Sequence, residues 1–373
     1  MAGPDPSGRY GKFGGRFVSE LSATFLDELK AEYDRLKKDA DFSRQLNELL
    51  SDYLGQPTPL FFARRFAEYL KGGKIYLKRE DLNYTGSAAA LNVLGQALLA
   101  KQLGRREIIV ESAGGEQAWA AASLARHFGL RARIYTSQPL PLLAQAQLRS
   151  NGAEVIIKAD YQYKDLVNVC VQDWLAEPLE RYYIPALPVG PHPLPEITRD
   201  LQSFIGLELA RAVQRKEQRP PDILAADSAL ALGAFYPFIK TEAELIVVEP
   251  VETIEDLAPL ADGQPAVFQG AYTRVLQYAN GQAGVYASPC PELNYPAVPP
   301  ELAYLHATGR LTLSKIPRQE LLAAADLFRE TEGLNVSLRS AAVLAELIRR
   351  APTAGRAKIL TGVLASADLE LWP

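Results

Sequence analysis

A single glutamate, Glu111, is the strongest candidate for acid–base chemistry in this sequence. It closes the apolar run REIIVE at residues 106–111, which is typical of a buried parallel strand. Ligands of open parallel sheets bind beyond the carboxyl ends of the strands, so we expect Glu111 to face a cleft. The alternative is a strand end that faces solvent. In a cleft, a desolvated carboxyl group can act as a general acid or base.

The remaining candidates lie at other turns of the same kind. Asp227 either caps the helix that follows it or contacts a ligand. An unpaired buried guanidinium is costly, so we expect Arg339 to pair with a carboxylate, either Asp227 or Glu111. The predicted substrate-binding residues are Tyr84, Ala88, Ala89, Leu91, Gln117, Asp227, Leu230, Arg339 and Leu364.

The composition argues against several other classes of site. A formal net charge of -4 does not indicate nucleic-acid binding, and no apolar run is long enough to span a membrane. None of the three histidines is spaced as a metal ligand would be, so no metal site is predicted. Two cysteines and an N-terminus without an apolar run favour a cytoplasmic protein.

Alternating strands and helices must position these residues. Strands are predicted at residues 106–112, 131–137, 153–159, 221–228, 243–250 and 357–362. Helices are predicted at residues 116–130, 141–152, 164–177, 318–333 and 340–350, with one more starting near Ala229. Such repeated units predict an α/β fold with parallel sheets covered by helices. The stretch 250–315, rich in Pro, Gly and Tyr, is predicted to be irregular.

Segments along nearly the whole chain match one family, including YGKFGGRFVSE, YLGQPTPLFFARR, IYLKREDLN and VGPHPLPEITRDLQSFIG. With these segments the chain resembles the β subunit of tryptophan synthase, a fold type II enzyme that uses pyridoxal phosphate. The resemblance implies a two-lobed α/β architecture with parallel-type sheets, and usually a homodimer. It implies an N-terminal lobe of residues 1–54 and 88–200, including a mobile communication segment, and a C-terminal lobe of residues 55–87 and 201–373.

The resemblance weakens at the site itself. Ala88 and Ala89 stand where the family has a His-Lys pair, whose lysine forms the Schiff base with the cofactor. Asp227 lies in the turn that should hold the phosphate, and Arg339 replaces a glutamate. Glu111 matches the acid–base glutamate of the family, whereas Glu116 would repel a substrate carboxylate. These departures predict a divergent member that lacks the residues that bind pyridoxal phosphate, has no cofactor and encloses a large vacant cavity.

Two functions follow from this interpretation. The first is acid–base chemistry without pyridoxal phosphate, a cyclisation, isomerisation or addition on a small apolar, aromatic or indole-like molecule. The second is a catalytically silent partner of an α-subunit-like protein, with Arg199 and Asp200 in the docking segment. Tryptophan synthesis itself is a minor alternative. Neither nucleic acid nor a membrane is expected as a partner.

Overall fold

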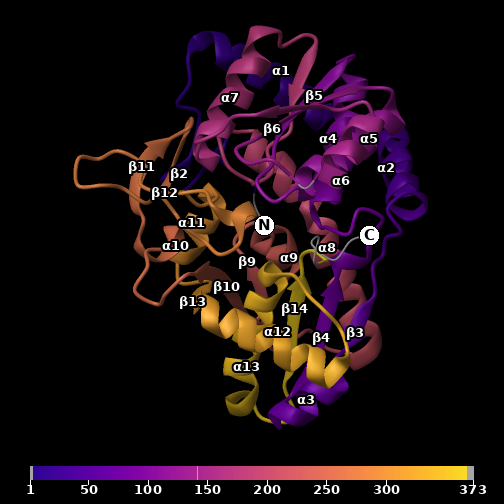
Figure 1. The fold of residues 1–373 in the computed structure, drawn as a ribbon, viewed down its shortest axis with the longest axis vertical. Helices are drawn as coiled ribbons and strands as arrows, with labels where there is room; N and C mark the ends of the chain where they lie inside the picture. The colour runs from indigo at the N-terminus through magenta and orange to yellow at the C-terminus, as the bar shows by residue number, and fades with distance from the viewer. Residues whose placement is uncertain (1–2, 141, 368–373) are drawn as a thin grey trace.

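The computed structural model describes residues 3–140 and 142–367, and two parallel sheets dominate it. The smaller one, at the top of Figure 1, has the order β7-β6-β5-β8. Its strands are β5 (Glu107–Glu111), β6 (Arg131–Thr136), β7 (Glu154–Ile157) and β8 (Arg181–Tyr183). Every neighbouring pair in it is parallel, which confirms the predicted α/β architecture for this part of the chain.

The larger sheet occupies the lower half of Figure 1 and has the order β13-β10-β9-β14-β4-β3. Its strands are β3 (Leu60–Phe62), β4 (Lys74–Arg79), β9 (Ile223–Asp227), β10 (Glu244–Val251), β13 (Thr312–Pro317) and β14 (Ile359–Leu364). Only the pairing of β3 with β4 is antiparallel. Side chains of a strand alternate between faces, so Leu224 and Ala225 enter different core clusters on the two sides of the sheet.

A third sheet corrects the prediction that residues 250–315 are irregular. Strands β11 (Gln264–Phe268) and β12 (Ala271–Val275) form a hairpin, and β12 pairs with β2 (Phe13–Gly14), which pairs with β1 (Arg9–Tyr10). The same stretch contains α10 (Pro259–Asp262) and α11 (Pro300–Ala307). Its regular structure depends on a partner strand near the N-terminus, and a local pattern does not reveal such a partner.

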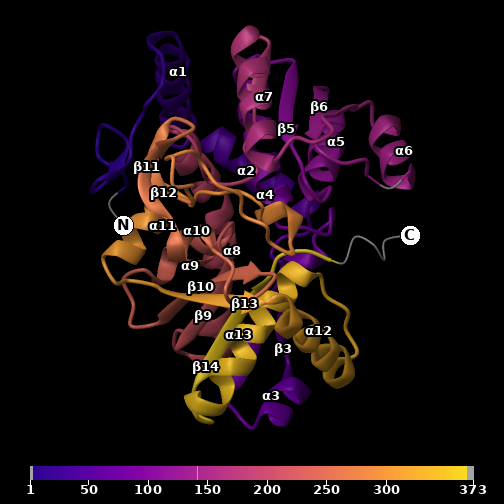
Figure 2. The ribbon, with the colours of Figure 1, turned by 60° about the vertical axis from the view of Figure 1, so that its left-hand side comes forward.

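Helices cover both parallel sheets, as Figures 1 and 2 show. The predicted helices are confirmed with small shifts at their ends, except that Pro141 lies outside the described residues. They are α5 (Glu116–Phe128), α6 (Leu142–Ser150), α7 (Tyr163–Ala176), α9 (Ala231–Phe235), α12 (Arg318–Glu332) and α13 (Leu338–Ala354). The others are α1 (Glu20–Leu36), α2 (Ala40–Asp52), α3 (Arg64–Leu70), α4 (Ala89–Gln102) and α8 (Leu194–Glu217), with short 3-10 turns η1 (Glu80–Leu82), η2 (Tyr236–Phe238) and η3 (Pro291–Leu293).

Helix α4 is enclosed by other elements along most of its length. All its residues from position 90 to position 100 are buried, which is expected for a helix that is apolar on every side and is surrounded by other elements. Its N-terminal end therefore lies deep in the interior. The described helices include none that is long and apolar enough to cross a membrane. The division into two lobes at the boundaries given above stays a prediction.

Candidate functional site

A small interior cavity lies where several turns of the sequence meet. Strand β9 ends near it, and helices α4, α5 and α13 begin around it. Among the predicted residues, Ala89, Gln117, Leu230 and Arg339 line it. The chain folds this way because helices that follow parallel strands start at the same edge of the sheet. The predicted convergence of the turns is therefore present in the structure.

Arg339 is held by two carboxylates. Its Nε and Nη2 donate hydrogen bonds to Asp227 at 2.9 and 3.0 Å, and its Nη1 donates one to Glu116 at 3.0 Å. The side chain of Asp227 is completely buried, and Arg339 is only 8% exposed. The pairing with Asp227 was one of the two predicted. Glu111, the other predicted partner, does not make this contact, and Glu116 takes its place.

The turn after β9 is closed by the same aspartate. Asp227 accepts hydrogen bonds from the N–H groups of Ala229 at 2.9 Å and Leu230 at 3.2 Å. Helix α9 begins only at Ala231, with Leu230 as its N-cap residue, so Asp227 orders the turn and is not the cap itself. The backbone donors of this turn are thus already used within the chain.

A second carboxylate fills the turn between β5 and α5. Glu292 accepts hydrogen bonds from the N–H groups of Ala113 at 3.3 Å and Glu116 at 3.2 Å. Gly114 permits this approach, because a Cβ on it would lie 2.7 Å from Oε1 of Glu292. The N-terminus of α5 and its free N–H groups favour a negative charge at this position. Burial and the nearby Glu116 raise the pKa of Glu292 to about 7.

Glu111 is buried rather than facing solvent, with an exposed fraction of 1%. One carboxyl oxygen accepts a hydrogen bond from the N–H group of Ala186 at 2.9 Å, and the other has no partner among the described residues. Burial raises the pKa of Glu111 from 4.5 to about 7, partly offset by the hydrogen bond from Ala186. Glu111 is not itself a lining residue, but Ala186 and the neighbouring Tyr163 are, so it lies directly behind the wall of the cavity.

Four predicted substrate-binding residues lie elsewhere. Tyr84 is 52% exposed and packs edge-on against Tyr53, with 5.2 Å between ring centroids. Ala88, Leu91 and Leu364 are buried in the hydrophobic cores rather than in the cavity wall. The predictions assume that every residue of a turn lines the pocket. Successive residues of a helix or strand point to different sides, so only some of them do.

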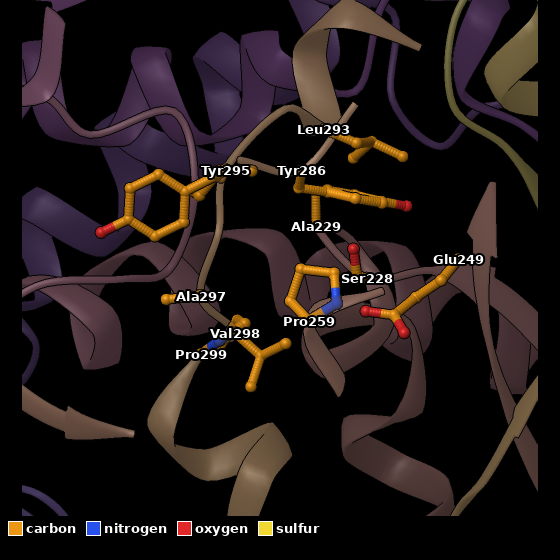
Figure 3. Close-up of a pocket in the computed structure, with 11 residues that line it drawn as sticks. Ser228, Ala229, Glu249, Pro259, Tyr286, Leu293, Tyr295, Ala297, Val298 and Pro299 are labelled. Atoms are coloured by element: carbon orange, nitrogen blue, oxygen red, sulfur yellow. The ribbon is translucent and has the colours of Figure 1, made fainter. Parts of the chain in front are cut away.

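The large cavity predicted from the sequence is also not found here, as far as the described residues show. The space that remains is about 20 Å³, which holds one water-sized group. The side chain of Arg339 and its partners occupy the volume, and the segment that carries Glu292 closes it. Figure 3 shows this segment around a neighbouring cavity of about 10 Å³, where Tyr286 and Leu293 lie over Ala229.

A larger cavity of about 270 Å³ lies on the other side of Tyr163. Aromatic and proline side chains contribute much of its wall, including Tyr161, Tyr286 and Pro296. Lys164 also lines it, but its Nζ donates a hydrogen bond to the carbonyl oxygen of Ala283 at 2.7 Å. Since Tyr163 lines both this cavity and the small one, it forms the shared wall.

Several residues of the site are not among those predicted from the sequence. Glu292, Tyr163 and Gln202 all line the small cavity, and each lies far in the sequence from the turns that contain Ala89, Gln117, Leu230 and Leu364. Little in the sequence indicates that Glu292 belongs to the site, since it is simply an isolated acidic residue in the proline-rich segment PCPELNYP. The segment around Arg199 and Asp200 also differs from expectation. Arg199 is buried and bonded to Glu301 at 2.7 Å, so it does not present a docking charge.

Comparison with known proteins places the chain among pyridoxal-phosphate proteins. Residues 52–363 match the family model described as "Pyridoxal-phosphate dependent enzyme". The tryptophan synthase beta chain of Afipia carboxidovorans is 37% identical, with 94% of this chain and 90% of that protein covered. That of Cereibacter sphaeroides is 38% identical, with coverages of 96% and 92%. The crystal structure of a T.th. threonine deaminase shares the fold, with 20% identity, a TM-score of 0.65 and coverages of 93% and 99%.

These matches overturn the prediction that the chain has no cofactor, because both the family model and the relatives point to pyridoxal phosphate. The side chains at the site do not themselves fit that group. Ala89 carries no amino group for a Schiff base. The N–H groups of Ala229 and Leu230, which would be donors for a phosphate, are bonded to Asp227. The family thus indicates a cofactor whose usual contacts these residues do not supply.

Proposed function

Since the chain belongs to the family of pyridoxal-phosphate dependent enzymes and has tryptophan synthase beta chains as relatives, we propose that it is a lyase-like enzyme that transfers a proton to or from a small aromatic or indole-like molecule. Glu111 is the acid–base residue in this proposal. The reaction is a cyclisation, an isomerisation or an addition. Each of these needs a proton moved at carbon or nitrogen, and a positioned carboxyl group can do this.

The state of Glu111 is the observation that carries this proposal. A carboxyl group with a pKa of about 7 exists in both protonation states near neutral pH, as a general acid or base requires. One of its oxygens has no hydrogen-bond partner among the described residues, which is costly and is often found at functional sites. Its place behind Ala186 and Tyr163 puts it next to the small cavity.

Access to Glu111 depends on Tyr163. The hydroxyl group of Tyr163 is buried and also lacks a hydrogen-bond partner among the described residues. It lies close enough to Glu111 to raise the pKa of that phenol in addition to the effect of burial. In this proposal, the side chain of Tyr163 shifts when a molecule binds, and a proton then passes between that molecule and Glu111.

The test compares turnover of the parent with that of Glu111→Gln, using indole and simple indole derivatives with and without added pyridoxal phosphate. Glutamine keeps the size and the bond to Ala186 but cannot transfer the proton, so we expect kcat/KM to fall by about 10²- to 10⁴-fold. Glu107→Gln is the matched control. It lies in the same strand, is 4% exposed and pairs with Arg181 at 3.0 Å, so it should lower stability and leave kcat unchanged. Equal turnover by parent and Glu111→Gln would refute the proposal.

A second candidate function is suggested by the names of the relatives, which are beta chains. In this proposal the chain binds an α-subunit-like protein and regulates it, and two copies of the chain form a homodimer in the cytoplasm. Light scattering of the chain alone and with the α chain of a relative tests both parts. If the α chain is activated equally by the parent and Glu111→Gln, and no small molecule is converted, this function replaces the first.

A further inference from the structure

We propose that the small cavity binds the amino group of its ligand and excludes carboxylates, so that the substrate is an aromatic amine and not an amino acid. This inference deepens the proposed function, because it names the substrate class of the same site. Three features of the cavity carry it: a carboxylate of the chain in the place of a ligand carboxylate, an excess of negative side chains, and acceptor atoms without donors.

Glu292 occupies the position where an incoming carboxylate would bind. The N–H groups of Ala113 and Glu116 at the start of α5 both point to its carboxylate, at 3.3 and 3.2 Å. A free carboxylate could use these donors only by displacing Glu292. The segment is fixed nearby, since Asn294 accepts a hydrogen bond from the N–H group of Ser288 at 2.7 Å and Tyr295 donates one to Gln269 at 2.6 Å. Displacement would therefore disturb more than one contact.

The charges around the cavity also disfavour a carboxylate. Glu116, Glu292 and Asp227 contribute three carboxyl groups, whereas Arg339 is the single basic residue that lines the cavity within the described chain. Arg339 is already bonded to Asp227 and Glu116, and Glu292 forms no ion pair of its own among the described residues, although Arg339 lies close enough to act on its pKa. Burial and Glu116 raise the pKa of Glu292 to about 7, so a nearby ammonium group would favour its charged form, while a second anion would meet repulsion.

Unpaired acceptor atoms indicate that the ligand is a hydrogen-bond donor. Gln117 is 2% exposed, and its Nε2 donates to the carbonyl oxygen of Ile184 at 3.3 Å. This bond fixes the amide, so its Oε1 is an acceptor and has no partner among the described residues. Oε1 of Gln202 on the cavity wall also lacks a partner among the described residues, although no hydrogen bond fixes the orientation of its amide. An ammonium group has three donors and no acceptor, and it fits into the roughly 20 Å³ that remains.

The larger cavity has the character expected for the rest of such a molecule. Its 270 Å³ is close to the lower end of small-molecule sites. Tyr161, Tyr286 and Pro291 give part of its wall an aromatic and apolar character, and Gln138, Lys164 and Asn294 add polar groups. Tyr161 is 43% exposed, so part of the wall of this cavity lies at the protein surface. Tyr163 forms the wall between the two cavities, so an aromatic amine would place its ring in the larger space and reach the small cavity with its amino group only when the side chain of Tyr163 shifts.

The test is calorimetric titration of the full chain with tryptamine, tryptophan and indole, which share one ring system and differ in their amino and carboxylate groups. We expect tryptamine to bind at least tenfold more tightly than tryptophan or indole. Glu292→Ala should free the donors at the start of α5, tighten tryptophan binding at least fivefold and weaken tryptamine. Glu292→Gln keeps the shape without the charge, so it should weaken tryptamine without improving tryptophan. Exposed Glu330→Ala, on α12, is the control and should change none of the three affinities.

Several results would overturn the inference. Tryptophan binding as tightly as tryptamine to the parent is one, and no binding of tryptamine is another. If Glu292→Ala does not fold, Glu292→Gln still decides, because unchanged tryptamine binding by that variant contradicts the role of the charge. The readout is binding without turnover. A failure here is therefore separate from a failure of Glu111 as the acid–base residue, which is read from kcat.

Discussion

Arg339 donates two parallel hydrogen bonds to the carboxylate of Asp227, from Nε at 2.9 Å and from Nη2 at 3.0 Å, although 112 residues separate them in the chain. The contact joins the start of α13 to the end of β9 in the middle of the molecule. Both partners are almost fully buried, so each supplies the charge that makes burial of the other tolerable.

Removing one partner of this pair should therefore be costly. Arg339→Met leaves the carboxylate of Asp227 buried without a cation, and we expect the free energy of unfolding to fall by about 3–5 kcal/mol. Arg329→Met on α12 is the control. Its bond to Asp326 is exposed, so the change should cost much less. Urea unfolding measures both, and similar losses in the two variants would contradict the importance of the buried pair.

The raised pKa of Glu111 predicts a pH-dependent stability. The folded state binds this proton up to about pH 7, whereas the unfolded chain releases it near 4.5. Protonated Glu111 thus stabilises the folded state at low pH, and this contribution is lost as the pH rises from about 4.5 to 7. Glu111→Gln removes the loss, so its stability relative to the parent should increase between pH 5 and pH 8, by about 1–3 kcal/mol. Urea unfolding at the two pH values tests this, and equal differences at both would contradict it.

Gly114 should be needed only because Glu292 lies against it. A methyl group on Gly114 would come within 2.7 Å of Oε1 of Glu292, and such overpacking typically costs about 1–3 kcal/mol. We expect Gly114→Ala to lower the free energy of unfolding by this amount in the parent and by much less in a Glu292→Ala background. Thermal and urea unfolding of the four proteins of this double-mutant cycle give the coupling. Additive effects would show that the two residues do not interact.

Arg199 is expected to act in the fold and not in the recognition of a partner. It is 3% exposed and donates to Glu301 at 2.7 Å and to the hydroxyl group of Tyr10 at 2.9 Å. Arg199→Met should lower the free energy of unfolding by about 3–5 kcal/mol. Arg318→Met, which breaks an exposed pair with Glu252, should change it by less than about 1 kcal/mol. A stable Arg199→Met protein with altered binding to an α chain would instead place this residue in an interface.

Much of the fold follows from local patterns in the sequence. Apolar runs such as residues 106–111 predict buried strands, and the helical periodicity of residues 116–130 predicts α5, because burial of one face or of a whole strand is a local requirement. The parallel arrangement then brings the turns after the strands to one edge of each sheet. On this basis the sequence predicted the neighbourhood of Ala89, Gln117, Leu230 and Arg339, and the burial of Glu111.

The details of the site were decided only by the tertiary structure. Periodicity does not specify which carboxylate meets Arg339, and the fold selects Asp227 and Glu116 over Glu111 because their side chains reach it. Nor does it place Glu292 against the start of α5, a contact between residues 176 positions apart. Both contacts fill volume that, from the sequence alone, was predicted to be an empty cavity. Local sequence thus determined the elements and their edges, whereas the free volume and the charge balance depended on which distant side chains packed together.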